Sequence, residues 1–238
     1  MRPVRLSILA AALVAAVAAP VAAASAGGRG HWGEEQALRL RLGVFEPRGE
    51  SRYWDEKAID FTSDPAEFDG LDLGVEYVRF LGNRLGVVAG SSYFYSGEVT
   101  QNYRFFVDER GGEILHDTEL ELARFHLGLL LHLFGRDAAI EPYVGGGVGL
   151  TLWKLREVGD FIDFEGGDEI FFGDFRDEGA VFGHYLQAGV EVPVARNWSV
   201  FADARWERAD DTLGGDFRGL GEIDLSGKTY SLGVAVSF

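Results

Sequence analysis

This chain lacks the features that define several protein classes. Its 238 residues contain no cysteine, which excludes a disulfide framework and thiolate chemistry. Basic residues are scarce, since 22 Lys and Arg stand against 38 Asp and Glu for a net charge of −16. That balance argues against nucleic acid as a partner. Beyond the amino terminus, no segment approaches the roughly 18 consecutive apolar residues of a membrane-spanning helix.

The amino terminus carries the one long apolar run. Arg2 and Arg5 precede an apolar stretch from Leu6 to Ala19, and Ala24-Ser25-Ala26 fits a small-x-small cleavage site. The pattern predicts a cleaved secretory signal peptide at residues 1–26. The alternative, an uncleaved anchor helix, would need a longer apolar stretch. Removal of the two arginines makes the net charge of the mature chain −18.

Large and small side chains alternate strictly at the carboxy-terminal end. The large set is Tyr230, Leu232, Val234, Val236 and Phe238, and the small set is Ser231, Gly233, Ala235 and Ser237. Because side chains alternate across a strand, this segment has one apolar face and one small face. In water such a terminal strand would invite aggregation, whereas in lipid it would close a barrel.

Similar alternating segments recur through the chain and predict eight strands. They are Gln36–Phe45, Leu71–Phe80, Leu85–Ser96, Glu121–Phe134, Ile140–Trp153, Gly183–Val192, Trp198–Arg208 and Gly227–Phe238. Tight turns alternate with long connections, as in outer-membrane barrels. We therefore expect a short segment at 27–35, then an all-β, antiparallel up-and-down transmembrane barrel at 36–238 with four long acidic extracellular loops.

The four long connections are 46–70, 97–119, 154–181 and 209–224, and they carry essentially all of the net negative charge. Three of them contain a Gly-Gly pair, at 111–112, 166–167 and 214–215, which suits a hairpin tip because glycine tolerates positive φ. We expect the third and fourth strands to continue beyond the bilayer as a ribbon. A similar extension around Phe161–Phe175 has weaker support, and mobile acidic loops are the alternative.

The seventh strand predicts which face meets lipid. Trp198 and Trp206 share one face, while Asp203, Arg205 and Glu207 share the other. A charged row facing hydrocarbon would cost roughly 2–4 kcal/mol per basic residue, so the tryptophan face points outward. Trp198 and Trp206 have the same separation along the chain as Tyr230 and Phe238, which predicts two aromatic girdles. The residues of these girdles are Trp198, Trp206, Tyr230 and Phe238.

The opposite faces of the strands predict a charged interior. The expected lumen network comprises Arg39, Arg41, Asp72, Glu76, Arg124, Glu191, Asp203, Arg205 and Glu207. Eight strands enclose a lumen just wide enough for side chains, so these charges should pair as a plug. A gated narrow pore is the alternative. The glycine-rich fifth strand, 143–150, has no clear orientation.

These features together resemble the OmpA/OmpX-type family of small outer-membrane β-barrels. The resemblance rests on the signal peptide, the eight alternating segments, the loop pattern and the terminal Tyr230-x-Leu232-x-Val234-x-Val236-x-Phe238. It implies that this terminal pattern is the signal read by the barrel assembly machinery. Because the chain stops at Phe238, no periplasmic peptidoglycan-binding domain is expected. The family contains structural proteins, adhesins, pores and a few enzymes, so the resemblance leaves the function open.

Enzymatic chemistry has little support in the sequence. A lipid-A-modifying barrel would need a nucleophilic serine near a histidine, and the candidates are Ser92 with His126 or His132. A lipid-modifying site should open toward the acyl chains, however, and these three residues are expected to face inward. Asp210-Asp211 would suit an omptin-like protease, but that resemblance requires ten strands.

A divalent cation site is the other chemical possibility. The acidic residues around the second Gly-Gly pair are Asp160, Asp163, Glu165, Asp168 and Glu169. Oxygen-rich loops suit Ca²⁺ or Mg²⁺, but this spacing matches no EF-hand loop, so a solvated acidic tip is favoured. No cofactor is expected.

The sequence thus predicts an integral outer-membrane protein with a structural or surface-interaction role and no catalysis. A small gated pore is the second hypothesis. A soluble lipocalin-like barrel is a third, in which Trp198 and Trp206 would line a ligand cavity. The expected partners are outer-membrane lipids and lipopolysaccharide, with the assembly machinery during biogenesis, and the expected state is a monomer.

Overall fold

The computed structural model describes residues 35–62, 64–164 and 166–238. The predicted signal peptide and nearly all of the segment at 27–35 lie outside the described residues. No helix within these described ranges is long and apolar enough to cross a membrane.

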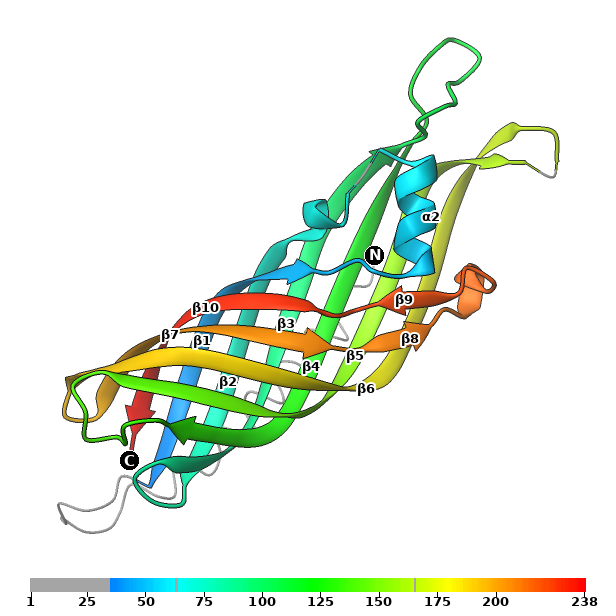
Figure 1. Cartoon of the computed structure of the whole chain (residues 1–238). Coiled ribbons are helices and arrows are strands. Elements are labelled where there is room, and N and C mark those ends of the chain that lie inside the picture. Colours follow the sequence, from blue (N-terminus) through cyan, green and yellow to red (C-terminus); the bar gives the residue numbers. More distant parts are fainter. Residues whose placement is uncertain (1–34, 63, 165) are drawn as a thin grey trace.

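Eight antiparallel strands form a closed barrel in the order β1-β10-β7-β6-β5-β4-β3-β2 (Figure 1). They are β1 (Gln36–Pro47), β2 (Gly70–Phe80), β3 (Leu85–Asn102), β4 (Leu115–His132), β5 (Glu141–Asp163), β6 (Glu169–Ala195), β7 (Trp198–Arg208) and β10 (Gly227–Ser237). Each strand pairs with its neighbours along the chain, and β1 closes the ring by pairing with β10. The predicted all-β, eight-stranded up-and-down barrel is confirmed.

Large apolar side chains cover the outside of the barrel. Leu42 on β1 lies between Leu73 on β2 and Leu232 on β10, and all three are more than half exposed. A continuous apolar band of this kind is unfavourable in water, but it is the surface that hydrocarbon requires. The lipocalin-like alternative is wrong, because Trp198 and Trp206 are exposed on this outer face instead of lining a cavity.

The glycine-rich part of β5 now has an orientation. Val144 and Val148 are exposed on the outer wall, whereas Tyr143 is buried in the interior. Gly145 therefore faces inward, where an added Cβ would lie 3.1 Å from the side chain of Gln187. The missing side chains on this strand make room for the polar groups that fill the lumen.

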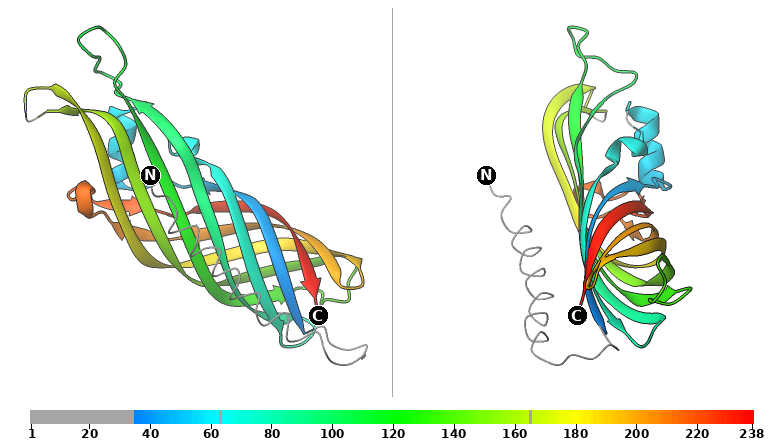
Figure 2. Two further views of the ribbon diagram at one scale, coloured as in Figure 1. Left: turned by 180° about the vertical axis from the view of Figure 1, so that it is seen from behind. Right: turned by 90° about the vertical axis from the view of Figure 1, so that its left-hand side faces the viewer.

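The strands β3 to β6 are much longer than the rest. They contain 18, 18, 23 and 27 residues, against 11 or 12 in β1, β2, β7 and β10. Their extra length forms a half-sheet that rises beyond the rim on the side of the long connections (Figure 2). The expected extension of the third and fourth strands is present, with a bulge between Tyr95 and Glu98.

The hairpin of β5 and β6 extends further than that of β3 and β4, although its support in the sequence was weaker. The pairing of β5 with β6 continues without a shift to Asp163 and Glu169, so the connection expected at 154–181 is largely strand. Aromatic side chains on its inner face explain why it stays ordered. The rings of Phe161 and Phe175, from opposite strands, pack at 4.9 Å, and such a pair stabilises a two-stranded ribbon.

The Gly-Gly pairs of the long connections lie in hairpin connections. Gly111-Gly112 and Gly166-Gly167 lie in the connections at the two tips, where Gly111 and Gly167 have φ of +78° and +101°. The third pair also lies in a hairpin connection, where Gly214 precedes the 3₁₀ turn η2 (Gly215–Phe217) and Gly215 has a φ of +49°. This turn joins the two short strands β8 (Asp210–Thr212) and β9 (Glu222–Asp224).

The first long connection contains a helix that was not predicted. It forms α2 (Arg52–Asp60), followed by the 3₁₀ turn η1 (Pro65–Phe68). The helix buries Tyr53, Trp54 and Lys57 on one face. It packs inside the half-sheet at the end of the barrel with the long connections (Figure 1), which in outer-membrane barrels is the extracellular end. This connection is therefore a folded unit and not a solvated acidic loop.

Candidate functional site in the lumen and its extracellular cap

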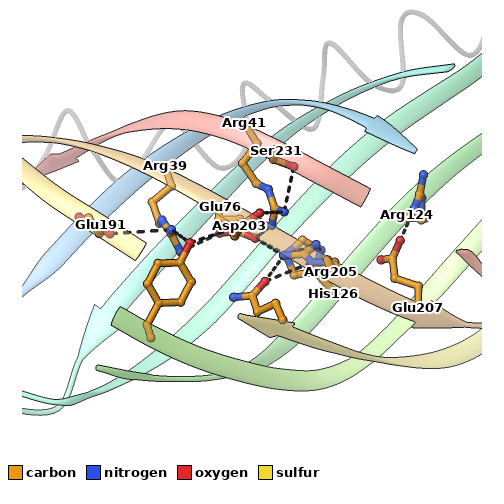
Figure 3. Close-up of polar contacts among 12 residues, drawn as sticks. Arg39, Arg41, Glu76, Arg124, His126, Glu191, Asp203, Arg205, Glu207 and Ser231 are labelled. Carbon is orange, nitrogen blue, oxygen red and sulfur yellow. Dashed lines mark hydrogen bonds and ion pairs between the residues drawn. The ribbon is translucent and has the colours of Figure 1, made fainter. Parts of the chain in front are cut away.

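Glu76 is the centre of an ion-paired network in the middle of the lumen (Figure 3). Its fully buried carboxylate lies 2.6 Å from Arg41 Nη1 and 3.4 Å from Arg39 Nη1, and it also pairs with Arg205. His126 Nε2 lies 3.2 Å away. Three arginines thus share one carboxylate, which brings four expected lumen residues together with a histidine that had no assigned partner.

Asp203 provides a second carboxylate for the same arginines. It accepts hydrogen bonds from Arg41 Nη2 at 2.7 Å and from the Tyr143 hydroxyl at 2.8 Å. Tyr143 itself accepts from Arg39 Nη2 at 2.6 Å, and Glu191 lies 3.8 Å from the same guanidinium nitrogen. The sequence did not assign Tyr143 to the lumen, because the glycines that follow it conceal the orientation of its strand.

A separate ion-paired group lies toward the extracellular end. Arg124 Nη2 pairs with Asp72 at 2.9 Å, and its Nη1 pairs with Glu207. The guanidinium carbon lies 4.2 Å from the ring centre of Phe45, a cation–π arrangement. The structure therefore places all nine residues of the expected network inside the barrel and pairs each of them with at least one opposite charge.

Little space remains between these side chains. A void of about 20 Å³ is bordered by Arg124, His126, Tyr185 and Glu207 among others. That volume holds about one water molecule. The buried hydroxyl of Tyr185 has no hydrogen-bond partner among the described residues, and it borders this void.

Above the ion pairs, an apolar core closes the mouth of the barrel. We call it the extracellular cap. Its buried residues are Phe45, Tyr53, Trp54, Phe68, Phe94, Val99, Leu120, Leu122, Trp153, Leu155, Ala209, Leu213, Phe217, Ile223 and Leu225. They come from α2, η1, η2, β9, the inner faces of the barrel strands and the short connections at Ala209, Leu213 and Leu225. The cap was missed because its residues are scattered through connections whose acidic composition suggested solvated loops.

A buried polar cluster fixes α2 to the half-sheet. Lys57 Nζ lies 2.7 Å from Glu157, 3.3 Å from Gln101 Oε1 and 3.2 Å from His116 Nε2. The Tyr53 hydroxyl donates to Glu157 at 2.7 Å. Burial and the adjacent ammonium group lower the pKa of His116 to about 3. Burial lowers the pKa of Lys57, although Glu157 opposes that shift. The cluster is thus built around a neutral histidine.

The candidate enzyme residues have structural partners instead. His126 contacts Glu76, and His132 Nδ1 lies 3.4 Å from Glu141. No hydrogen bond joins Ser92 to either histidine in the described part of the chain. Without a serine–histidine contact these residues do not form a nucleophile and its base.

The described acidic residues of the tip lie at the turn between β5 and β6. Across the described ranges, no group of three or more His, Cys, Asp or Glu side chains is placed to hold a metal ion. Asp163 instead accepts a hydrogen bond from the backbone of Gly166 at 2.8 Å, which orders the turn. Glu165, the middle member of the expected acidic group, lies outside the described residues.

The aromatic residues expected at the membrane interfaces lie on the outer wall. Trp198, Trp206 and Tyr230 are 50%, 44% and 47% exposed. Trp198 pairs with Val236 in the register of β7 and β10, while Tyr230 lies opposite Ala204 near the other end. Trp198 is thus at one end of the apolar band, and Trp206 and Tyr230 are at the other.

Comparison with known proteins supports the fold. No protein-family model and no curated protein matches the sequence. The chain is similar to the outer membrane protein OprG from Pseudomonas aeruginosa, with 14% identity, 85% of this chain and 95% of that chain covered, and a TM-score of 0.52. This likeness concerns the fold, an eight-stranded antiparallel β-barrel.

Two further solved barrels are also similar. A major outer membrane protein from Thermus thermophilus has 13% identity over 85% of this chain and 99% of that chain, with a TM-score of 0.49. Neisserial surface protein A has 13% identity over 87% of this chain and 98% of that chain, with a TM-score of 0.47. The architecture and apolar band of this barrel make it an integral outer-membrane protein.

Proposed function

We propose that this outer-membrane barrel is non-conducting and non-catalytic, and that its role is carried by its extracellular surface. This proposal is supported by the observation that the lumen is closed at two levels along the barrel axis. Ion pairs centred on Glu76 fill the middle of the lumen, and the extracellular cap covers its mouth. A pore would need a continuous water path past both.

The two levels resist opening for different physical reasons. Separating Glu76 from its arginines leaves buried charges unpaired, which typically costs about 3–5 kcal/mol. Opening the cap exposes apolar side chains, at roughly 25 cal/mol per Å². A gate that opens under ordinary conditions would have to overcome both costs together.

Single-channel recording in planar bilayers tests this proposal. We expect no conductance steps from the refolded barrel under conditions in which a reference porin conducts. Lys57→Met should also be silent, because loosening α2 leaves the ion pairs below it in place. Steady conductance steps from the wild-type barrel would refute the closed lumen and favour the pore.

The outer wall supports two further parts of the proposal. We propose that Trp198, Trp206, Tyr230 and Phe238 contact lipid headgroups at the two interfaces, with lipopolysaccharide in the outer leaflet. We propose that the barrel is a monomer and that the terminal alternation from Tyr230 to Phe238 is its assembly signal. Phe238→Ala should lower the yield of assembled barrel in cells, whereas Ser237→Ala should not.

A further inference from the structure

The two extracellular tips present phenylalanines to solvent far from the apolar band. We define the tip patch as Phe105, Phe106, Val107, Phe164 and Phe172. Four of these side chains are more than half exposed: Phe105 at 76%, Phe172 at 71%, Val107 at 63% and Phe164 at 55%. The tips are the loop between β3 and β4 and the hairpin of β5 and β6 (Figure 1). Exposed patches of this kind mark interaction sites.

The patch is held in place by a built scaffold. Asp108 Oδ1 accepts hydrogen bonds from the backbone of Arg110 at 2.8 Å and of Gly112 at 2.6 Å, which folds the first tip into a compact turn. The rings of Phe106 and Phe164 pack at 5.2 Å and join the two tips. The exposed side chains are therefore presented by an ordered surface, which lowers the entropic cost of binding.

The charge around the patch indicates what it contacts. Between Asp160 and Phe175 the sequence contains six acidic residues, five phenylalanines and no Lys or Arg, whereas residues 104–110 of the first tip contain two arginines and two acidic residues. The net negative charge of the patch is therefore on the hairpin of β5 and β6. A second copy of this chain would bring the same negative charge to the contact, and so would an anionic lipid surface. A partner with both apolar and basic side chains would satisfy the phenylalanines and the carboxylates together, because interfaces pair complementary potentials.

We propose that the tip patch is the docking surface for a cationic, apolar segment of another protein. This inference rests on the proposed surface role and names the chemistry of the partner. The phenylalanines supply the apolar contact, and basic side chains of the partner lie over aromatic rings and beside Asp160, Asp168 and Glu169, which are all exposed. Affinity should fall with salt because the flanking charges are on the surface.

The probe for this proposal is a labelled cationic amphipathic peptide of leucine and lysine. Its affinity is measured by anisotropy for the barrel in zwitterionic nanodiscs, with empty nanodiscs as the reference. Two control peptides replace its lysines by glutamate or its leucines by serine. We expect the leucine–lysine peptide to bind the barrel at least roughly tenfold more tightly than it binds empty nanodiscs or than either control binds the barrel.

Variants then locate the contact. Combined Phe105→Ser, Val107→Ser and Phe172→Ser should weaken binding roughly tenfold or more. The matched control is Ile59→Ser, on the exposed face of α2 at 63% exposure, which should leave binding unchanged. The three tip substitutions remove only exposed side chains, and Phe106 and Phe164 are kept so that the tips stay joined.

A second variant tests the charge. Combined Asp160→Asn, Asp168→Asn and Glu169→Gln should weaken binding and flatten its salt dependence. The proposal would be overturned if the leucine–lysine peptide bound empty nanodiscs as tightly as the barrel, or if the glutamate peptide bound the barrel equally well. Unchanged binding by the serine variant would also overturn it. So would self-association of the wild type that the serine variant abolishes. None of these results alters the conductance test, so this inference can fail while the closed barrel stands.

Discussion

Acid should loosen the extracellular cap, and His116 is the residue that makes this measurable. It lies where β4 has left the apolar band, enclosed by the rings of Phe61 at 4.6 Å and Phe161 at 4.8 Å. Its pKa falls from 6.5 to about 3 because it is buried beside Lys57. The folded cap therefore holds His116 neutral at pH values where an open cap would let it take up a proton.

The sign and size of the effect follow from that difference. A histidine whose pKa is lowered by folding contributes its full stability above pH 6.5, and the contribution is lost as pH falls from 6.5 toward 3. Between pH 7 and pH 5 the loss amounts to about 2 kcal/mol, or roughly a 25-fold rise in the population of the open cap. Lys57 and Glu157 face the same imidazole, so its protonation would place two cations beside one carboxylate.

The absence of cysteine makes a clean assay available. A Val99→Cys thiol, beneath α2 at 8% exposure, reports opening through its rate of maleimide labelling. An Ile59→Cys thiol on the exposed face of α2 reports the intrinsic pH dependence of the reaction. The ratio of the two rates should rise roughly 25-fold from pH 7 to pH 5.

His116→Phe provides the decisive comparison. Phenylalanine keeps an aromatic ring between Phe61 and Phe161 but cannot be protonated, so the rise in the labelling ratio should disappear. A wild-type ratio that is the same at pH 7 and pH 5 would refute the reasoning. A variant that keeps the full rise would show that another group causes it.

Three further predictions concern the barrel itself. Glu76→Gln should lower the free energy of unfolding in lipid by about 3–5 kcal/mol, because three arginines lose their shared carboxylate. Glu191→Gln should lower it by less than half as much, and urea titrations measure both free energies. Gly189→Ala should lower the thermal midpoint, since its Cβ would lie 2.6 Å from both the Tyr143 hydroxyl and a backbone oxygen. Leu129→Arg should destabilise the inserted barrel by roughly 2–4 kcal/mol in lipid unfolding measurements, whereas Ile59→Arg should be neutral.

The sequence predicted the wall of the barrel because a strand has a strict two-residue period. On β7, Trp198 and Arg205 differ in parity, and the cost of a charge in hydrocarbon decides which of them faces outward. The same rule directed Arg39 and Glu76 inward. It could not show that Glu76 is shared by three arginines, since that depends on how β1, β2 and β7 meet across the lumen.

The cap escaped prediction for a different reason. Trp54 and Phe68 lie in the connection at 46–70, whereas Phe217 and Ile223 lie in the connection at 209–224, and both connections are acidic. No local period links them, because they form a core only after the barrel has brought the loops together. The five phenylalanines between Asp160 and Phe175 were a usable signal for the ordered β5–β6 hairpin, because solvated acidic loops seldom contain so many aromatic side chains. They did not point to the cap, against which only Phe175 packs.

The lumen and the extracellular tips differ in how many of their charged and aromatic side chains are free to contact a ligand. Within the lumen, every residue of the expected network pairs with an opposite charge, which leaves little to offer a ligand. At the tips, acidic side chains and phenylalanines are exposed on an ordered scaffold. Covering an exposed phenylalanine with a partner is favourable, because it removes apolar surface from water. The tips are therefore better suited to bind a partner than the lumen is. The long β5–β6 hairpin then serves to carry that surface away from the membrane.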